Sequence, residues 1–427
     1  MKKRTALFVP SYDGHIRTFH RIIEKMKETG FWEPCVVFLE GIHGNLLREY
    51  SKKYSFPLIP LRFPYRKNPV VGGIAARISN AWDYYAYLRT VQKEVVQLFD
   101  SKEPAFLVTA TEGFTDTHFL FEARKRRIPS LCLCSYLVSL SLNMERTEIR
   151  KPGLMQTMYN TGLSLAGLPY SEEPLGYADI AALWGKHHYT SFLERGVSPS
   201  QLAVIGSPAH DLIFNRLRDA DLDSPAVKKL KVGFRIHPNK HVFLFCTQPV
   251  AVDGLCTSEE QRFLTEQVIE ACNRFDDHVL IIKLHPRETV QQYTWLQHYL
   301  DSGRVYIFAE VEADLFDLLN ISDIMITQSS STGLDALLFG RDMVIVDVLT
   351  QVKDAMGYVA AGAALNILDP ADLFNTLKRL LNDKETKKKL SSQRQKFIAT
   401  CIDRFDGRAT ERVLSLIESM LKERRQY

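Results

Sequence analysis

A run of hydroxyl side chains follows an apolar segment late in the chain, where residues 324–340 read IMITQSSSTGLDALLFG. Ser329, Ser330, Ser331 and Thr332 stand between a predicted strand and a predicted helix. Backbone N–H groups at the start of a helix are unpaired and carry partial positive charge, so such a turn attracts anions. The segment therefore predicts an anion site, and phosphate is the anion we expect. The alternative is that Ser331 or Thr332 only caps the helix.

Three donor or cationic side chains end an earlier apolar segment, in which residues 279–288 read VLIIKLHPRE. Lys283, His285 and Arg287 alternate along the chain, which predicts that they point to one side of the strand end. Ligands of parallel α/β sheets bind outside the carboxyl ends of the strands. We therefore expect this basic tip and the hydroxyl run to share one crevice. A core histidine and a solvated strand end are the alternatives.

Histidine and acidic side chains follow two predicted strands of the first half. Asp13 and His15 come after the first strand, and Glu112 and Asp116 come after the strand predicted at 106–109. Histidine and carboxylate groups at such positions can move protons. We predict that either Glu112 or His15 is a general base and that a carboxylate near His15 orients its imidazole. The alternative is that these residues cap helices or lie in loops.

Strand-then-helix units repeat on both sides of a polar, Lys-rich stretch at 219–239. Such alternation predicts an α/β protein with two doubly wound, parallel-sheet, Rossmann-like domains facing a cleft. We expect a first domain over 1–206, an interdomain segment over 207–240, a second domain over 241–400 and a C-terminal helix over 401–427 that packs back on the first domain. The predicted strands span residues 5–9, 34–39, 56–61, 106–109, 131–138, 178–184, 202–205, 241–246, 305–308 and 343–348, together with the two apolar segments above.

Composition limits the class of protein. The 427 residues include 54 Lys and Arg and 50 Asp and Glu, a balance of +4 that does not suggest a nucleic-acid partner. The seven cysteines are odd in number and lack Cys-x-x-Cys spacing, so we expect buried thiols in a reducing compartment. The first apolar run is too short for a signal peptide, and no run approaches the length of a membrane helix. We therefore expect a cytoplasmic protein and leave peripheral contact with the inner membrane surface open.

The second half resembles a known group of enzymes over roughly residues 200–412. The shared features are the His-Pro pair at 285–286, an acidic helix start at 312–315, Ser322-Asp323, the hydroxyl run, and the segment FDGRATER at 405–412. Together they resemble nucleotide-sugar glycosyltransferases of the B-type fold, which has two Rossmann domains. The most similar are bacterial capsule and surface-polysaccharide enzymes of the polysialyltransferase-like, Kdo-transferase-like and CDP-glycerol glycerophosphotransferase-like groups.

For the second domain, the resemblance implies that His285 and the hydroxyl run hold the nucleotide phosphate of the donor. Thr247 and Gln248, after the strand at 241–246, are similar to a donor-phosphate loop, and an ordinary turn is the alternative. Asp335 stands near the place of a ribose-binding glutamate but has a shorter side chain.

For the first domain, the resemblance implies a histidine base at the position of His15. The segment 111–116 is imperfectly similar to the acidic-acidic-Gly motif of polysialyltransferase-like enzymes, because Thr111 replaces the first acid.

These features lead us to predict an inverting, metal-independent glycosyltransferase of capsule or other polysaccharide biosynthesis that needs no cofactor. It would move a sugar from a CMP-, CDP- or UDP-linked donor, bound by the second domain, to a glycan, lipid-linked or protein acceptor on the first. The alternatives are an isomerase like UDP-N-acetylglucosamine 2-epimerase, a glycerophosphotransferase, and a non-catalytic nucleotide-sugar-binding protein. The Gly-Thr-Arg-Pro-Glu start and Ser-Gly-Gly turn that are usual in the epimerase are absent from this sequence.

Overall fold

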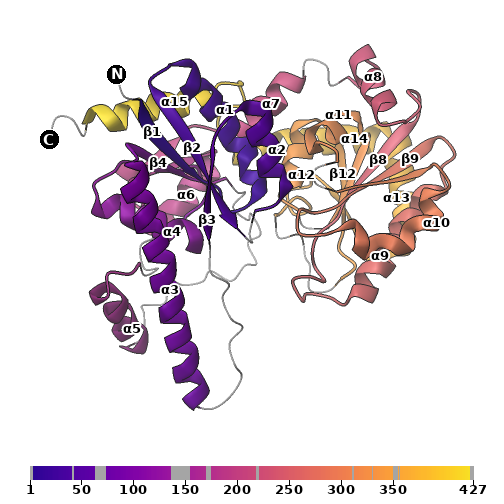
Figure 1. Cartoon of the computed structure of the whole chain (residues 1–427). Coiled ribbons are helices and arrows are strands. Elements are labelled where there is room, and N and C mark those ends of the chain that lie inside the picture. Colours follow the sequence, from indigo (N-terminus) through magenta and orange to yellow (C-terminus); the bar gives the residue numbers. More distant parts are fainter. Residues whose placement is uncertain are drawn as a thin grey trace. The chain divides into compact units, whose positions relative to one another are not determined.

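The chain divides into two compact units, shown in the computed structural model of Figure 1. The first unit comprises Met1–Tyr136, Thr147–Ala209 and Arg408–Tyr427, and the second contains His210–Gly407. The C-terminal segment thus belongs to the first unit. The structure describes residues 3–40, 43–62, 74–135, 154–169, 175–217, 221–309, 312–328, 330–349, 354 and 356–423.

The first unit is built on a parallel seven-stranded sheet with the order β3-β2-β1-β4-β5-β6-β7. Consecutive strands run outward in one direction from β1 and in the other direction from β4. The carboxyl edge of β1 and β4 is therefore the switch point at which parallel sheets bind ligands. The strands are β1 (Arg4–Val9), β2 (Trp32–Glu40), β3 (Leu58–Arg62), β4 (Phe106–Thr109), β5 (Ser130–Cys132), β6 (Ile180–Leu183) and β7 (Leu202–Val204).

Alternate residues of β1 enter two different hydrophobic clusters, because successive side chains of a strand point to opposite faces. Ala6 and Phe8 pack with α1, α2 and α15, whereas Leu7 and Val9 pack with α3, α4 and α6. Helices thus cover both faces of the sheet, as a parallel sheet requires. The helices are α1 (Ile16–Glu28), α2 (Asn45–Tyr54), α3 (Ile74–Lys102), α4 (Phe114–Lys125), α5 (Leu154–Leu165), α6 (Lys186–Glu194) and α15 (Ala409–Glu423).

The second unit has a parallel six-stranded sheet with the order β10-β9-β8-β11-β12-β13. Here the strand order reverses between β8 and β11, which makes their carboxyl edge the second switch point. The strands are β8 (His241–Cys246), β9 (His278–Lys283), β10 (Val305–Phe308), β11 (Ile324–Thr327), β12 (Asp342–Val346) and β13 (Leu365–Ile367).

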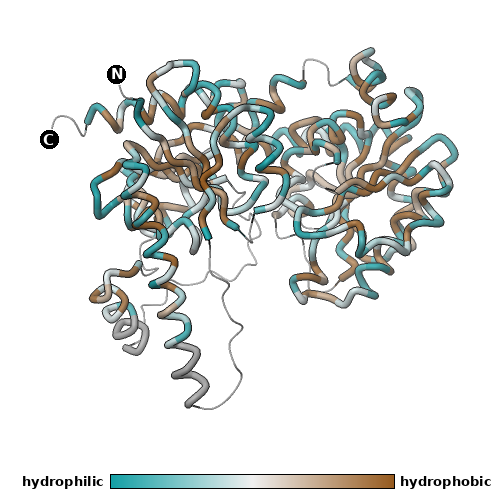
Figure 2. The backbone as a smooth tube through the Cα atoms, viewed as in Figure 1, coloured by the Kyte–Doolittle hydropathy of each residue, from teal (hydrophilic) through white to brown (hydrophobic). Residues whose placement is uncertain are grey.

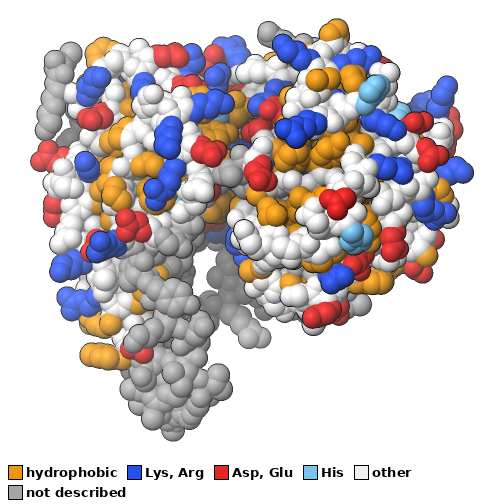
Figure 3. Space-filling model, turned by 45° about the vertical axis from the view of Figure 1, so that its right-hand side comes forward, with side chains coloured by type: hydrophobic (Ala, Val, Ile, Leu, Met, Phe, Trp, Pro, Cys, Tyr) orange, Lys and Arg blue, Asp and Glu red, His pale blue; other side chains and the backbone are white. Residues whose placement is uncertain are grey.

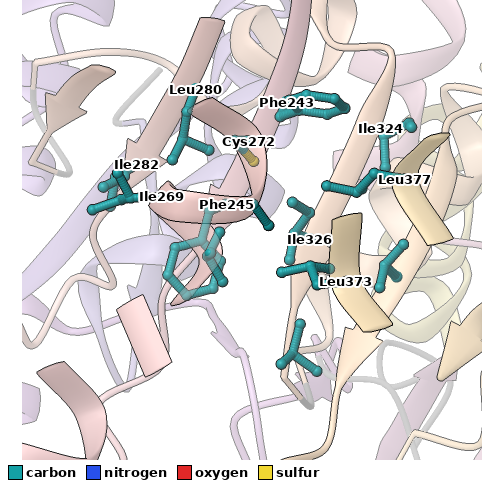
Figure 4. Close-up of a cluster of buried hydrophobic side chains, with 14 of the residues drawn as sticks. Phe243, Phe245, Ile269, Cys272, Leu280, Ile282, Ile324, Ile326, Leu373 and Leu377 are labelled. Atoms are coloured by element: carbon teal, nitrogen blue, oxygen red, sulfur yellow. The ribbon is translucent and has the colours of Figure 1, made fainter. Parts of the chain in front are cut away.

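A single large cluster fills one face of this second sheet. Figure 4 shows Phe243 and Phe245 of β8 beside Leu280 and Ile282 of β9, with Leu377 of α13 near Ile324 of β11 and Leu373 of α13 near Ile326 of β11. These side chains are almost completely buried, so apolar burial holds β8, β9 and β11 in fixed register. The helices are α7 (Pro208–Arg216), which starts at the division between the units, α8 (Pro225–Gly233), α9 (Ser258–Asn273), α10 (Gln297–Leu300), α11 (Leu315–Ile321), α12 (Thr332–Leu338), α13 (Leu373–Asn382) and α14 (Lys384–Cys401).

The predicted two-Rossmann α/β fold is confirmed. Strand β13 was not predicted, and the other strands differ from the prediction at most at their boundaries. The strand predicted at 131–138 is Ser130–Cys132, and residues 136–138 lie outside the described residues. The predicted interdomain segment 207–240 contains the helices α7 and α8. Figure 2 shows why the strands were easier to predict than their ends: they form the most hydrophobic stretches of each unit.

The surface charges, the helices and the cysteines can each be compared with the expectations from composition. On the face shown in Figure 3, Lys and Arg side chains are interspersed with Asp and Glu. Within the described ranges, no helix is both long and apolar enough to span a membrane. All seven cysteines are free thiols, and six of them are buried.

Candidate active site

Three adjacent strand ends bring the predicted donor-binding residues of the second unit together. Strand β8 pairs with β9 on one side and β11 on the other, so that Cys246 lies opposite both Lys283 and Thr327. Beyond the strand, the backbone N–H of Thr247 donates to the Lys283 carbonyl at 3.0 Å. The Thr327 hydroxyl donates to the Cys246 carbonyl at 3.0 Å. Thr247 therefore lies between the His-Pro segment and the hydroxyl turn.

Glu288 is a buried carboxylate that holds this edge together, and the sequence analysis did not single it out. It accepts hydrogen bonds from the Thr247 hydroxyl and, at 3.1 Å, from the His285 backbone N–H. It also accepts from Gln261 Nε2 at 2.5 Å and from the Tyr293 hydroxyl at 2.7 Å. Four donors on one carboxylate fix the loops after β8 and β9. Its place directly after the His-Pro-Arg run was the only available sequence signal.

His285 is half-buried and has a defined proton position. Its Nδ1 accepts the backbone N–H of Arg287 at 3.1 Å. The proton of the neutral imidazole therefore sits on Nε2, which can donate to an anion.

The other two predicted cations have protein partners. The buried Lys283 ammonium donates to the Ala309 carbonyl at 2.6 Å. The exposed Arg287 guanidinium makes a two-pronged ion pair with Asp253, at 2.5 and 2.8 Å. Their contact with a donor stays a prediction.

The hydroxyl turn lies at the end of β11, although Ser329 falls outside the described residues. The Ser330 hydroxyl accepts the backbone N–H of Thr332 at 3.2 Å, which shapes the turn before α12. Ser331 occupies the N-cap position, yet its side chain makes no capping hydrogen bond. The Ser331 side chain therefore does not cap α12.

A tyrosine braces the turn from the side. The Tyr358 hydroxyl donates to the Ser330 carbonyl at 2.9 Å, and Tyr358 is fully buried. A Cβ atom on Gly333 would come within 2.7 Å of the Tyr358 ring, so this close approach requires glycine.

Two further side chains occupy this edge. The amide of Gln328 is buried, and its Nε2 has no hydrogen-bond partner among the described residues, which makes it a donor that the sequence analysis missed. Asp335 lies in the first turn of α12, with one oxygen 3.9 Å from the Nε2 of buried His210. Its role at a ribose stays a prediction.

In the first unit, His15 lies at the carboxyl edge of β1, beside β4. Its Nδ1 accepts the backbone N–H of Ser11 at 3.1 Å, and its buried Nε2 has no partner in the described part of the chain. The Tyr12 ring packs over the imidazole at a centroid distance of 3.7 Å. Burial, with a smaller contribution from His43, lowers the pKa of His15 to about 3. His15 is therefore neutral, with its proton on Nε2.

Asp116 is completely buried at the start of α4 and is connected to the same loop. The Ser11 hydroxyl donates to Asp116 Oδ2 at 2.6 Å, and the Thr111 hydroxyl donates to the same oxygen. Oδ1 has no hydrogen-bond partner within the described ranges. Burial raises the pKa of Asp116 to about 7, although the bonds from Ser11 and Thr111 oppose this shift. Ser11 thus links His15 to Asp116.

The two other predicted acidic residues have structural partners. Both carboxylate oxygens of Asp13 lie 3.0 Å from the backbone nitrogen of Gly44, which directly precedes α2. Glu112 Oε1 accepts from Arg195 at 2.9 Å. Asp13 therefore anchors the loop before α2, and Glu112 is in an ion pair.

Glu112 also lies close to the thiols of Cys132 and Cys134. One carboxylate oxygen and the two sulfur atoms lie within 4.8 Å of one another. The Arg195 guanidinium would compete with a cation for this carboxylate, so we assign no metal to this cluster.

Several solved structures share the two-unit architecture. The UDP-GlcNAc 2-epimerase of Neisseria meningitidis, bound to UDP-GlcNAc, has a TM-score of 0.64 at 13% identity, covering 97% of this chain and 100% of that one. The calicheamicin glycosyltransferase CalG4 has a TM-score of 0.60 at 12% identity, covering 99% of each chain. The wall teichoic acid polymerase TagF has a TM-score of 0.59 at 14% identity, covering 100% of this chain and 91% of that one. At such identities the likeness shows the B-type fold alone.

The sequence itself matches a family. No curated protein matches the chain in a sequence search. The family model of the CDP-glycerol:poly(glycerophosphate) glycerophosphotransferases matches residues 182–419, which is more than half of the chain. The matched segment includes the whole edge built from β9, β8 and β11. The chain therefore belongs to the CDP-glycerol:poly(glycerophosphate) glycerophosphotransferase family, a family of transferases.

Proposed function

We propose that this protein is an inverting transferase that moves a sugar from a CMP-, CDP- or UDP-linked donor to a hydroxyl of a glycan, lipid-linked or protein acceptor. The observation that carries the proposal is the edge of β9, β8 and β11, where His285 Nε2–H and the Gln328 amide can donate and the Ser330 hydroxyl shapes the turn before α12. Such donors suit a phosphate, and the Glu288 carboxylate beside them already accepts from four protein donors.

The proposed reaction makes two demands on the protein. The acceptor hydroxyl must lose its proton as it attacks, and the departing nucleotide must be stabilised as negative charge grows on its phosphate. We assign the second task to the edge of the second sheet and the first task to the edge of β1 and β4. The donors named above supply the counter-charge, so the proposal includes no metal ion.

Transfer of glycerophosphate from CDP-glycerol is the second candidate, and family membership favours it. The acceptor hydroxyl would then attack phosphorus instead of an anomeric carbon and release CMP. Both reactions need a bound nucleotide phosphate and a proton acceptor, so the same residues would serve either one. An epimerase activity has the support of the fold alone, because the matching epimerases are only distantly related in sequence.

A thermal-shift screen against CMP, CDP, UDP, GDP, CDP-glycerol and nucleotide sugars tests the proposal. A ligand at about 100 times its dissociation constant should stabilise the protein by roughly 2.7 kcal/mol. The nucleotide that binds is then offered with its sugar or glycerol to mixed acceptors, and release of free nucleotide is measured. Turnover with CDP-glycerol but with no nucleotide sugar would show that the protein transfers glycerophosphate and not a sugar. Binding without turnover would favour the non-catalytic alternative.

Substitutions at the second edge test the assigned donors. We expect His285→Ala, Gln328→Ala and Ser330→Ala each to weaken nucleotide binding by about 1–3 kcal/mol, because each removes a hydrogen bond to a charged group or reshapes the turn. His298→Ala is the control, since His298 is exposed and its Nδ1 bonds to the Trp295 carbonyl. Unchanged nucleotide affinity in the first three variants would contradict the assignment of the phosphate site to this edge.

A further inference from the structure

At the edge of β1 and β4, two titratable side chains, His15 and Asp116, each have a buried polar atom without a hydrogen-bond partner among the described residues. These atoms are His15 Nε2, which is a donor, and Asp116 Oδ1, which is an acceptor. Buried polar groups in native proteins are nearly always paired, so each exception needs an explanation, and a catalytic role is one of these explanations. The two atoms differ in the direction of their hydrogen bonds, so they are suited to different tasks.

The hydrogen bond from the Ser11 backbone N–H determines which nitrogen of His15 carries the proton. An amide N–H can only donate, so His15 Nδ1 must keep its lone pair, and the single proton of the neutral ring lies on Nε2. His15 cannot accept a proton at Nε2 in this arrangement, because that nitrogen already carries one. It can only donate from Nε2, for example to an oxygen of the substrate.

His43 shows the same arrangement with a structural outcome. Its Nδ1 accepts the Leu39 backbone N–H at 2.9 Å, and its Nε2 donates to the Pro10 carbonyl at 2.9 Å. Both nitrogens are therefore satisfied within the protein. The same bond to Nδ1 thus leaves His15, unlike His43, with a donor to offer.

Ser11 has spare capacity to accept a proton, whereas Thr111 has less. Both hydroxyls donate to Asp116 Oδ2, and their oxygens lie 3.1 Å apart. Thr111 Oγ1 additionally accepts the Gly113 backbone N–H at 3.1 Å. Ser11 is only half-buried, whereas Asp116 is completely buried. A substrate hydroxyl can therefore reach the carboxylate through Ser11 Oγ.

Building on the proposed function, we propose that Asp116 is the terminal proton acceptor of the transfer reaction, reached through the Ser11 hydroxyl, and that His15 donates a hydrogen bond to substrate and is not the base. As the acceptor oxygen forms its bond to the donor, its proton passes to Ser11 Oγ, and the Ser11 proton passes to Asp116 Oδ2. Ser11 ends unchanged and Asp116 ends as a neutral carboxylic acid. The nucleotide leaves with the electron pair of the broken bond.

The charges near these groups agree with this direction of proton flow. The pKa of Asp116 near 7 reflects burial, and the carboxylate of Glu112 adds to the shift. Arg195 forms an ion pair with Glu112. The positive charge of Arg17 opposes the rise in the pKa that burial causes for Tyr12, whose ring covers His15. Burial and His43 keep His15 neutral near pH 7.

Transfer rates of five variants test the proposal with the donor identified above. We expect Asp116→Asn and Ser11→Ala each to lower the rate by about 100- to 10,000-fold at unchanged nucleotide affinity. The double variant should be no slower than Asp116→Asn, because the two residues act in one chain. His15→Gln should be at least about tenfold faster than His15→Ala, since an amide N–H can replace the donor but not a base.

The pH profile separates a chemical role of Asp116 from a structural one. The wild-type rate should rise through about pH 7 as Asp116 ionises, and Asp116→Asn should lack that rise while Glu112→Gln keeps it. His20→Gln is the control, because His20 is buried on α1 with Nδ1 bonded to the Ile16 carbonyl. Its folded protein should keep the wild-type profile.

Three results would overturn the proposal. The first is a normal rate in Ser11→Ala, and the second is a pH rise that persists in Asp116→Asn. The third is a His15 side chain that carries its proton on Nδ1, as read by ¹⁵N NMR of labelled histidines with His15→Gln to assign the signal. This third measurement needs no turnover. A protein that binds nucleotide but never transfers would therefore refute the proposed function, and the His15 tautomer would still be decided.

Discussion

The carboxyl edges of the two sheets differ in how their polar atoms are paired. In the second unit, the Glu288 carboxylate receives four donors, which come from the loops after β8 and β9, from α9 and from the 3-10 helix Val290–Leu296. In the first unit, Asp116 receives two hydroxyls on one oxygen, and its other oxygen has no hydrogen-bond partner in the described part of the chain. Both carboxylates are buried, so the difference lies in their hydrogen bonds.

This difference separates two uses of a buried acid. A carboxylate with four donors fixes the backbone around it, which suits a site that must keep its shape for phosphate. The charged form of a buried carboxylate with an unpaired oxygen is less well stabilised, so its pKa rises and it takes up a proton readily. The second edge is therefore suited to binding and the first to proton transfer.

Acidification should give the largest effect and should act on the first unit. Histidines with lowered pKa values are neutral in the fold, whereas unfolded histidine takes up a proton below about pH 6.5. The contribution of each such histidine to the free energy of unfolding is thus fully present above about pH 6.5. As the pH falls toward 4, the fold loses on the order of 2–3 kcal/mol for each buried ring. The raised pKa of Asp116 acts in the opposite direction between about pH 4 and 7. Burial lowers the pKa of four histidines in the first unit: His15, His20, His43 and His118.

Hydrogen exchange followed by mass spectrometry at pH 7 and pH 5 measures this loss in each unit separately. In the second unit, burial lowers the pKa of His278, whereas the hydrogen bond to Asp323 raises the pKa of His241. We expect the first unit to lose protection first. Earlier opening of the second unit would contradict the comparison.

Loss of the Glu288 carboxylate should have the next largest effect. Glu288→Ala leaves the Tyr293 hydroxyl and the Gln261 amide without their acceptor in a buried place, so we expect a loss of about 2–4 kcal/mol in unfolding free energy. Urea denaturation measures it. Glu266→Ala, which removes a partly exposed ion pair with Arg262, is the control and should cost under about 1 kcal/mol. Equal losses in the two variants would show that the network does not hold the edge.

Removal of the Arg287 side chain should have the smallest effect on stability. Its ion pair with Asp253 is exposed, with 55% of the Arg287 side chain accessible, so Arg287→Ala should change the unfolding free energy by less than about 1 kcal/mol. Nucleotide affinity at low and high salt measures whether Arg287 also reaches the donor. A larger drop in affinity than in stability, present only at low salt, would add Arg287 to the binding edge.

Much of the fold and part of the site were readable in the sequence. Apolar runs of four to six residues placed β1, β4, β8, β9 and β11, because buried parallel strands need side chains that are apolar on both faces. The residues directly after these runs, such as His15 and His285, had to lie at a carboxyl edge, because a parallel sheet brings all its strand ends to one side. Local order along the chain is sufficient for this inference.

Partners and protonation states depended on the tertiary structure. Glu112 and His15 looked equally fit to be a base, but Glu112 pairs with Arg195, 83 residues away, and the Ser11 backbone fixes the proton of His15 on Nε2. The burial of Asp116 and the donors on Glu288 come from loops far apart in sequence. Spacing along a strand shows which face a side chain takes, whereas a pKa depends on every neighbour within a few ångströms, and only the folded chain brings those neighbours together.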